Sequence, residues 1–200
     1  MAKDIGNSLQ VSVGSSLPTY KAVLCDVVPY ATASDILNIS IPTTSTIALV
    51  ISRVYVSYDA TAASTANVYI IRRSTANTGG TPTTLTTTQS AFLSGFANIT
   101  QHDTNDQASQ ATVVGYTVAP SPVGTPNVID AGHITIPAVA TPTVSVTYFE
   151  LNYNNRGAKP PVIRPGQSIS LSFGGTNAVP AGASVYATIE WVEVPLMSLF

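Results

Sequence analysis

The chain has 200 residues and a net charge of −2, with hydrophobic residues at 44% of its positions and charged residues at only 9%. The length suffices for one large all-β domain or for one domain with an extension. The low charge argues against nucleic acid as the main partner, because phosphate binding requires clustered lysines and arginines. It also argues against an isolated cytosolic enzyme, since soluble domains carry charges at about 25% of positions. A neutral surface rich in Thr and Ser can instead pack closely against many copies of a partner, because little charge is desolvated on contact.

The chain carries no sign of a disulfide, a secretion signal or a membrane span. Cys25 is its only cysteine, so it has neither an internal disulfide nor a thiolate metal site, and we expect this side chain to be a small buried hydrophobe. The first residues lack the apolar core of a signal peptide. No run approaches the roughly 18 apolar residues of a membrane span. We therefore expect a protein that is made in a cytoplasm, is not secreted and has no membrane partner.

Residues 1–18 are predicted to form an N-terminal arm. Leu9, Val11 and Val13 alternate there with polar residues. This pattern is typical of a short strand or of an arm that adds to a neighbour's sheet.

A single β domain is predicted for residues 19–195, followed by an apolar tail at 196–200. Period-two alternation between Gly and Pro turns predicts about ten short strands and no long helix. The clearest predicted strands lie at residues 20–28, 36–41, 46–58, 67–73, 111–118, 132–136, 144–151, 168–173 and 185–191. The tail ends on Leu199 and Phe200, which require a pocket in their own subunit or in another one.

Two sets of apolar residues in the strand predicted at 46–58 lie in opposite phases. They are Ile47, Leu49 and Ile51, then Val54, Val56 and Tyr58. The change of phase near Ser52 predicts a β-bulge or a strand that changes sheets.

The two closing strands, 168–173 and 185–191, alternate strictly and follow a predicted turn at Arg164-Pro165-Gly166. Because their apolar faces match, we expect them to form one wall of a sandwich, with Trp191 in the core. The whole pattern predicts an all-β fold, an antiparallel β-sandwich of jelly-roll type with an extended N-terminal arm.

Residues 74–110 are predicted to be an irregular loop insertion into this domain. Phe92, Leu93, Phe96 and Ile99 fit one or two helical turns, or a loop pinned by apolar side chains. Such a loop could contact another subunit or fold back over its own core, and both alternatives remain open.

The nearest approach to a catalytic or metal-binding cluster is His102-Asp103 with Asn105 and Asp106. A carboxylate beside an imidazole can orient a general base, and the acidic group could supply oxygens to a calcium ion. However, His133 is the only other histidine and lies in a different segment, and no nucleophile motif accompanies either one. We therefore expect no catalytic residue, no metal and no cofactor, and predict a local turn in which Asp103 or Asn105 binds the backbone.

Aromatic and basic residues allow further interpretations. Tyr148, Tyr153 and Tyr186 are free to form a sugar-binding face or a subunit contact. Arg72 and Arg73 are the only adjacent basic pair, and we expect them to make local ion pairs at a strand end.

Three groups of residues along the sequence form a pattern that is found in a known family. The first is Ile71-Arg72-Arg73-Ser74-Thr75-Ala76-Asn77-Thr78-Gly79-Gly80-Thr81. The second is His102-Asp103, Asn105, Ala108, Ala111, Val113, Tyr116-Thr117 and Pro120. The third is Arg164-Pro165-Gly166-Gln167 with Ile189-Glu190-Trp191. Together these groups resemble a family of tailed-bacteriophage virion proteins described as capsid decoration, or cement, proteins. The similarity spans residues 54–194, although the spacing between Gly80 and His102 is longer here than in the family.

The resemblance implies a non-enzymatic β-sandwich on the surface of a phage capsid, often a trimer, whose partners are the major capsid protein and other copies of itself. The residues expected to contact these partners are Leu9, Val11, Val13, Phe92, Phe96, Leu199 and Phe200. The alternative is a fibre, spike or adhesin module that binds surface glycans.

Overall fold

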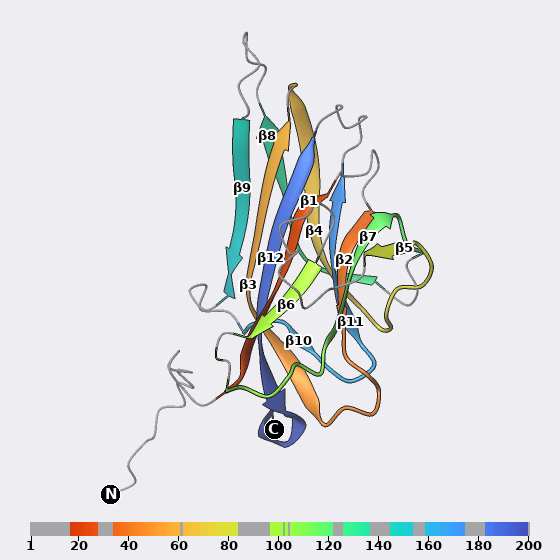
Figure 1. Cartoon of the computed structure of the whole chain (residues 1–200), viewed down its shortest axis with the longest axis vertical. Coiled ribbons are helices and arrows are strands. Elements are labelled where there is room, and N and C mark those ends of the chain that lie inside the picture. The colour runs from red at the N-terminus through yellow and green to blue at the C-terminus, as the bar shows by residue number, and fades with distance from the viewer. Residues whose placement is uncertain are drawn as a thin grey trace, which may run out of the picture.

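The chain folds into two β-sheets packed face to face. The structure, a computed structural model, describes residues 17–27, 34–60, 62–83, 97–101, 103, 105–121, 126–136, 145–153, 159–174 and 183–199. Within these residues twelve strands form two six-stranded sheets, and all of the strand pairs are antiparallel (Figure 1). The predicted all-β antiparallel sandwich is confirmed.

The first sheet, sheet A, is built around the long strand β3. Its order is β10 (Val162–Ile163), β3 (Ile47–Ala60), β12 (Ser184–Pro195), β1 (Thr19–Val27) and β6 (Ala97–Gln101). Strand β9 (Ser145–Asn152) pairs with β3 along the same edge as β10. Sheet B has the order β5 (Thr81–Thr83), β7 (Thr112–Val118), β2 (Ser34–Ser40), β11 (Ser168–Gly174), β4 (Ser64–Arg73) and β8 (Pro126–Ile136).

Eight of these strands pair in a nested order. The first pairs with the last (β1 with β12), the second with the seventh (β2 with β11), the third with the sixth (β3 with β9) and the fourth with the fifth (β4 with β8). Strands β5, β6 and β7 lie between β4 and β8 in the sequence, and they extend sheet A beside β1 and sheet B beside β2. The jelly-roll subtype of the sandwich stays a prediction at this level.

The core lies between the sheets and is closed by large aromatic side chains. Trp191 is fully buried, as predicted, and its ring stacks on Tyr20 with centroids 5.9 Å apart. Further along the sandwich, the rings of Tyr58 and Phe173 bring sheets A and B together at a centroid distance of 5.2 Å. Full burial of such side chains contributes roughly 1.5–3 kcal/mol each, so these four rings supply a substantial part of the stability of the sandwich.

The predicted β-bulge in β3 is confirmed. Arg53 pairs with Glu190 and Ile51 with Trp191, so Ser52 is the extra residue. The bulge lets the apolar residues on both sides of it face the core, and β3 stays in sheet A throughout.

The two closing strands do not share a wall, which corrects the prediction from their matching apolar faces. Strand β11 lies in sheet B and β12 lies in sheet A, and their apolar faces meet across the core. Alternation shows which side of a strand is buried, but the buried sides of two opposed sheets give the same pattern.

The stretch predicted as an irregular insertion, 74–110, contains two strands, β5 and β6. Residues 97–99 of the predicted helical or looped segment are extended in β6, where Ile99 pairs with Ala22 of β1. A short apolar segment can be helical or extended, and here its pairing with β1 makes it extended. Strand β8 is also longer than predicted and begins at Pro126, which an edge strand tolerates.

Candidate functional site

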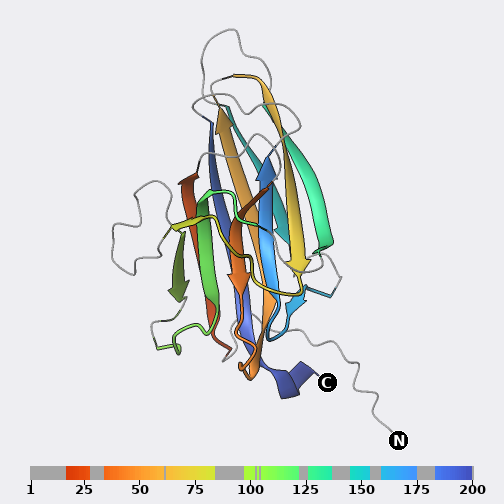
Figure 2. The ribbon, with the colours of Figure 1, turned by 90° about the vertical axis from the view of Figure 1, so that its right-hand side faces the viewer.

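Residues 74–80 form a strap across the outer face of sheet B. Strands β4 and β5 lie on opposite sides of this sheet, so the connection between them has to cross β11, β2 and β7. Figure 2 shows the yellow chain after β4 running across these strands toward β5. The strap is fixed at its far end by two backbone hydrogen bonds between Thr78 and Ser121, and Gly79 and Gly80 turn there with φ of 65° and 74°.

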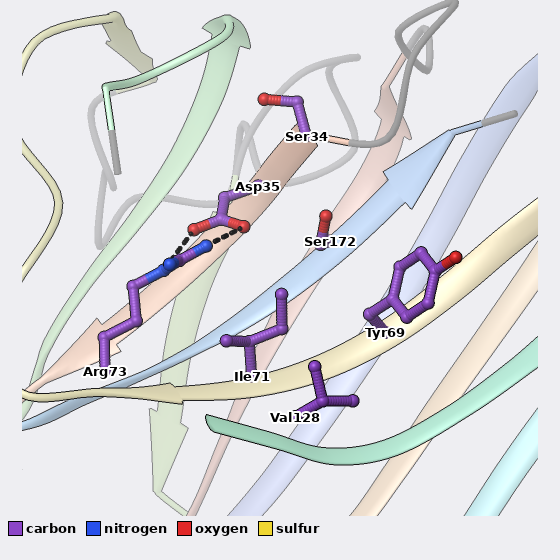
Figure 3. A pocket seen from close by; sticks show the side chains of 7 residues that line it. All are labelled: Ser34, Asp35, Tyr69, Ile71, Arg73, Val128 and Ser172. Atoms are coloured by element: carbon purple, nitrogen blue, oxygen red, sulfur yellow. Dashed lines mark hydrogen bonds and ion pairs between the residues drawn. The ribbon is translucent and has the colours of Figure 1, made fainter. Parts of the chain in front are cut away.

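A buried ion pair lies beneath the strap. Arg73 donates from Nε and Nη2 to the two carboxylate oxygens of Asp35, at 2.9 and 3.0 Å (Figure 3). Arg73 is 6% exposed and Asp35 is 1% exposed. From the strap, Asn77 donates a further hydrogen bond of 2.7 Å to Asp35. The fork geometry and the third donor offset the cost of removing both charges from water.

The polar face of β11 is also covered. Asn38 donates to the hydroxyls of Ser168 and Ser170 at 3.0 and 2.8 Å, and Ser168 donates to the carbonyl of Thr75 in the strap at 2.7 Å. Both serines are fully buried. The sequence indicated that these serines lie opposite the core, but it gave no sign that the strap covers them.

A depression of about 310 Å³ opens beside the ion pair, on the same face (Figure 3). Asp35, Arg73, Ser34 and Ser172 form its polar part, and Tyr69, Ile71 and Val128 form its apolar part. The carboxylate and guanidinium neutralise one another, so the surface suits an uncharged polar ligand. Its lining thus combines hydroxyl and charged groups with apolar side chains, as small-molecule binding sites do.

The partner of Arg73 differs from the local one that we expected. Asp35 precedes it by 38 positions and belongs to β2, two strands away in sheet B. Arg72 lies instead at a second depression of about 410 Å³, together with Lys159 and Asp130.

The predicted local turn at Asp103 is confirmed. The backbone amide of Asn105 donates to Asp103 Oδ1 at 2.9 Å, and that of Asp106 donates to the Asp103 carbonyl at 3.1 Å. His102 lies outside the described residues. Within the described part of the chain no three His, Cys, Asp or Glu side chains are grouped as metal ligands.

A buried carboxylate anchors the crossover from β6 to β7. Glu193 is 7% exposed and accepts hydrogen bonds from the Ser109 hydroxyl at 2.6 Å and from the Gln110 amide at 3.0 Å. The hydroxyl of Tyr20 donates to the carbonyl of Gln107. Burial, and then the charges of Glu193 and Asp106, raise the pKa of Tyr20 to about 12. Sequence reasoning missed Glu193, although it shares the phase of Trp191 and so was due to point inward.

Of the three tyrosines predicted to be free for contacts, Tyr186 is 39% exposed on the outer face of sheet A. Tyr153 is only 5% exposed, so for this residue the prediction is wrong. It follows directly on β9, where its neighbour Leu151 is also buried. The side chain of Tyr148 lies outside the described residues.

The predicted partner-contact residues lie almost entirely outside the described residues. This holds for Leu9, Val11, Val13, Phe92, Phe96 and Phe200. Leu199 ends the short 3₁₀ helix η3 (Leu196–Leu199), but its side chain is not described. Their role as contacts stays a prediction.

No protein-family model matches the sequence, and comparison with curated proteins finds no significant match. The resemblance to phage decoration proteins therefore stays a prediction. Among the described residues no helix is long and apolar enough to cross a membrane.

We predict that Asp35→Asn lowers the free energy of unfolding by about 3–5 kcal/mol, because it leaves the buried Arg73 guanidinium without a counter-charge. Urea unfolding monitored by tryptophan fluorescence measures this change. Glu150→Gln is the matched control, since Glu150 pairs with Arg53 at 2.9 Å where the side chains are 35% and 41% exposed. That exposed pair is worth about 1 kcal/mol or less. Equal effects of the two substitutions would contradict the structural role of the buried pair.

Proposed function

We propose that the protein is a non-enzymatic virion structural protein of a tailed bacteriophage that decorates the capsid and stabilises it by bridging neighbouring major capsid protein subunits. The observation that carries this proposal is the charge-poor exterior of a β-sandwich. Exposed strand positions such as Thr65, Thr112 and Thr135 hold hydroxyls where lysine or glutamate is usual. Such a surface loses little hydration when it is packed against a shell, so many weak contacts can add up.

We further assign the sandwich to the jelly-roll type. The nested pairing of eight strands supports this assignment, because a long antiparallel hairpin of four strand pairs gives this order when it is wrapped into two sheets. Wrapping such a hairpin brings the strands of one pair beside those of another. The pairing of β12 with β3 and of β11 with β4 fits this expectation.

The proposed mechanism is multivalent. Each subunit contacts adjacent capsid proteins through apolar burial and through strand addition by the arm at residues 1–18. The protein acts as a homo-oligomer, in the form of a trimer, on the outer surface of capsids assembled in the host cytoplasm. It needs no metal, cofactor or nucleic acid for this role.

Electron cryomicroscopy of the source particle tests the proposal. We expect density for the sandwich at repeated positions on the capsid lattice, near its symmetry axes. Density confined to a tail or fibre, or absence of the protein from every particle, would overturn the assignment to capsid decoration.

Deleting residues 1–13 should abolish binding to capsids without unfolding the domain. The reason is that Leu9, Val11 and Val13 supply the proposed added strand, whereas the described strands begin at Thr19. Co-sedimentation with capsids measures binding, and the thermal unfolding midpoint is the control for folding. Normal binding of the shortened protein would show that the arm has no such role.

The depression beside Asp35 and Arg73 favours a second candidate function, the binding of surface glycans. Neutral sugars present hydroxyls to polar side chains and apolar ring faces to aromatic ones, and Tyr69 lines the same depression as Asp35, on the far side of Ser172 (Figure 3). A phage fibre or spike module would use such a site on a host cell.

If glycans bind there, Tyr69→Ala should weaken binding on a glycan array about tenfold or more. Tyr186→Ala is the matched control, because Tyr186 is exposed on the other sheet. No saturable binding by the unchanged protein, or equal loss in both variants, would rule out this site.

A further inference from the structure

Four connecting segments meet at one end of the sandwich, which we call the terminal pole. They are residues 42–46, 107–110, 164–167 and 195–198. The hydroxyl of Ser45 donates to Gln110 at 2.9 Å, and the amide of Leu196 donates to the Thr46 carbonyl at 3.0 Å. The amide of Gly166 donates to the Ile41 carbonyl at 3.0 Å. These bonds connect all four segments, so the pole is a preorganised surface.

The composition of the terminal pole differs from that of the sheet faces. Its four segments read Pro-Thr-Thr-Ser-Thr, Gln-Ala-Ser-Gln, Arg-Pro-Gly-Gln and Pro-Leu-Met-Ser, so Arg164 is their one charged residue. Asp103 and Asp106 stand on the turn that precedes the second segment. The outer face of sheet A carries Arg53 with Glu150 and Glu190, at 2.9 and 3.9 Å.

Both ends of the described chain lie at the terminal pole. The carbonyl of Pro18 accepts a hydrogen bond of 3.2 Å from the amide of Glu193, so the described chain begins here. The helix η3 closes the other end at the same place, as Figure 1 shows at the C label. Met197 in this helix is 90% exposed, the most exposed large hydrophobic residue in the described part of the chain. A partner that docked at the pole would cover this side chain and gain the free energy of its apolar burial.

We propose that the terminal pole is the surface that docks on the capsid, with Met197 at the centre of the contact. This inference rests on the proposed function. The occupant is a charge-poor protein surface of the shell, because a charged one would lose hydration without gaining ion pairs from segments that hold a single arginine. Sixteen residues precede Leu17, and a fully extended chain of that length can span at most about 58 Å, far enough to reach an adjoining capsid subunit. Docking by the pole leaves the strap and the depression of sheet B exposed.

The test uses particles assembled without this protein, to which the purified full chain is added back. Met197→Glu should weaken binding to these particles roughly tenfold or more, because docking would then bury an unpaired carboxylate. Val128→Glu is the matched control: Val128 is 54% exposed, lies on β8, the edge strand of sheet B and outside the four segments of the pole, and receives the same substitution. It should bind like the unchanged protein. Both variants should keep the thermal unfolding midpoint of the unchanged protein, since both positions are exposed.

The outcomes separate this inference from the proposed function. Failure of the unchanged protein to bind the particles would overturn both. Binding of the unchanged protein together with full binding by Met197→Glu would overturn docking by the pole alone, and loss of binding by Val128→Glu would place the contact on sheet B instead.

Discussion

The outer face of sheet B depends on the ion pair between Arg73 and Asp35. The strand order forces the chain after β4 to cross this face, and the crossing removes water from the serines of β11. Every polar group beneath the strap then needs a partner from the protein. Asp35 meets this need at the centre, because it binds Arg73 at the end of β4 and Asn77 within the strap. The strap keeps water from the ion pair, and the ion pair holds the strap in place.

Because the chain has so few charged residues, burying three of them affects the charge of its whole surface. Charged residues occupy 9% of the sequence, and Asp35, Arg73 and Glu193 are each at most 7% exposed. These three side chains hold connections between strands in place. Because they are buried, they add almost nothing to the charge of the surface. Fewer charged side chains therefore reach the surface than the sequence contains, and such a surface can pack closely against another protein with little loss of hydration.

Alternation and turn chemistry predicted most of the strands, because both are local. The bulge at Ser52 followed from a change of phase, and Gly166 has the positive φ expected of the turn after Pro165. Sheet membership could not be predicted, since β11 and β12 show the same alternation from opposite walls. The partner of Arg73 could not be predicted either, because it lies 38 positions away and is brought near by the strand order alone. The inward phase of Glu193 was visible in the sequence and was the one available sign of a buried carboxylate.

The nested strand order also explains why both ends of the described chain lie at the terminal pole. Strands β1 and β12 are antiparallel neighbours with Thr19 opposite Val192, so the start of one lies beside the end of the other. The same nesting sets Ser40 opposite Ser168, which brings the connections that follow β2 and precede β11 to this end. Topology thus collects chain ends and tight turns at one place, and three of the four segments that meet there, 42–46, 107–110 and 195–198, hold no charged residue. The convergence of the chain ends follows from the strand order and the low charge of these segments from their sequence, and any partner that meets this end meets both.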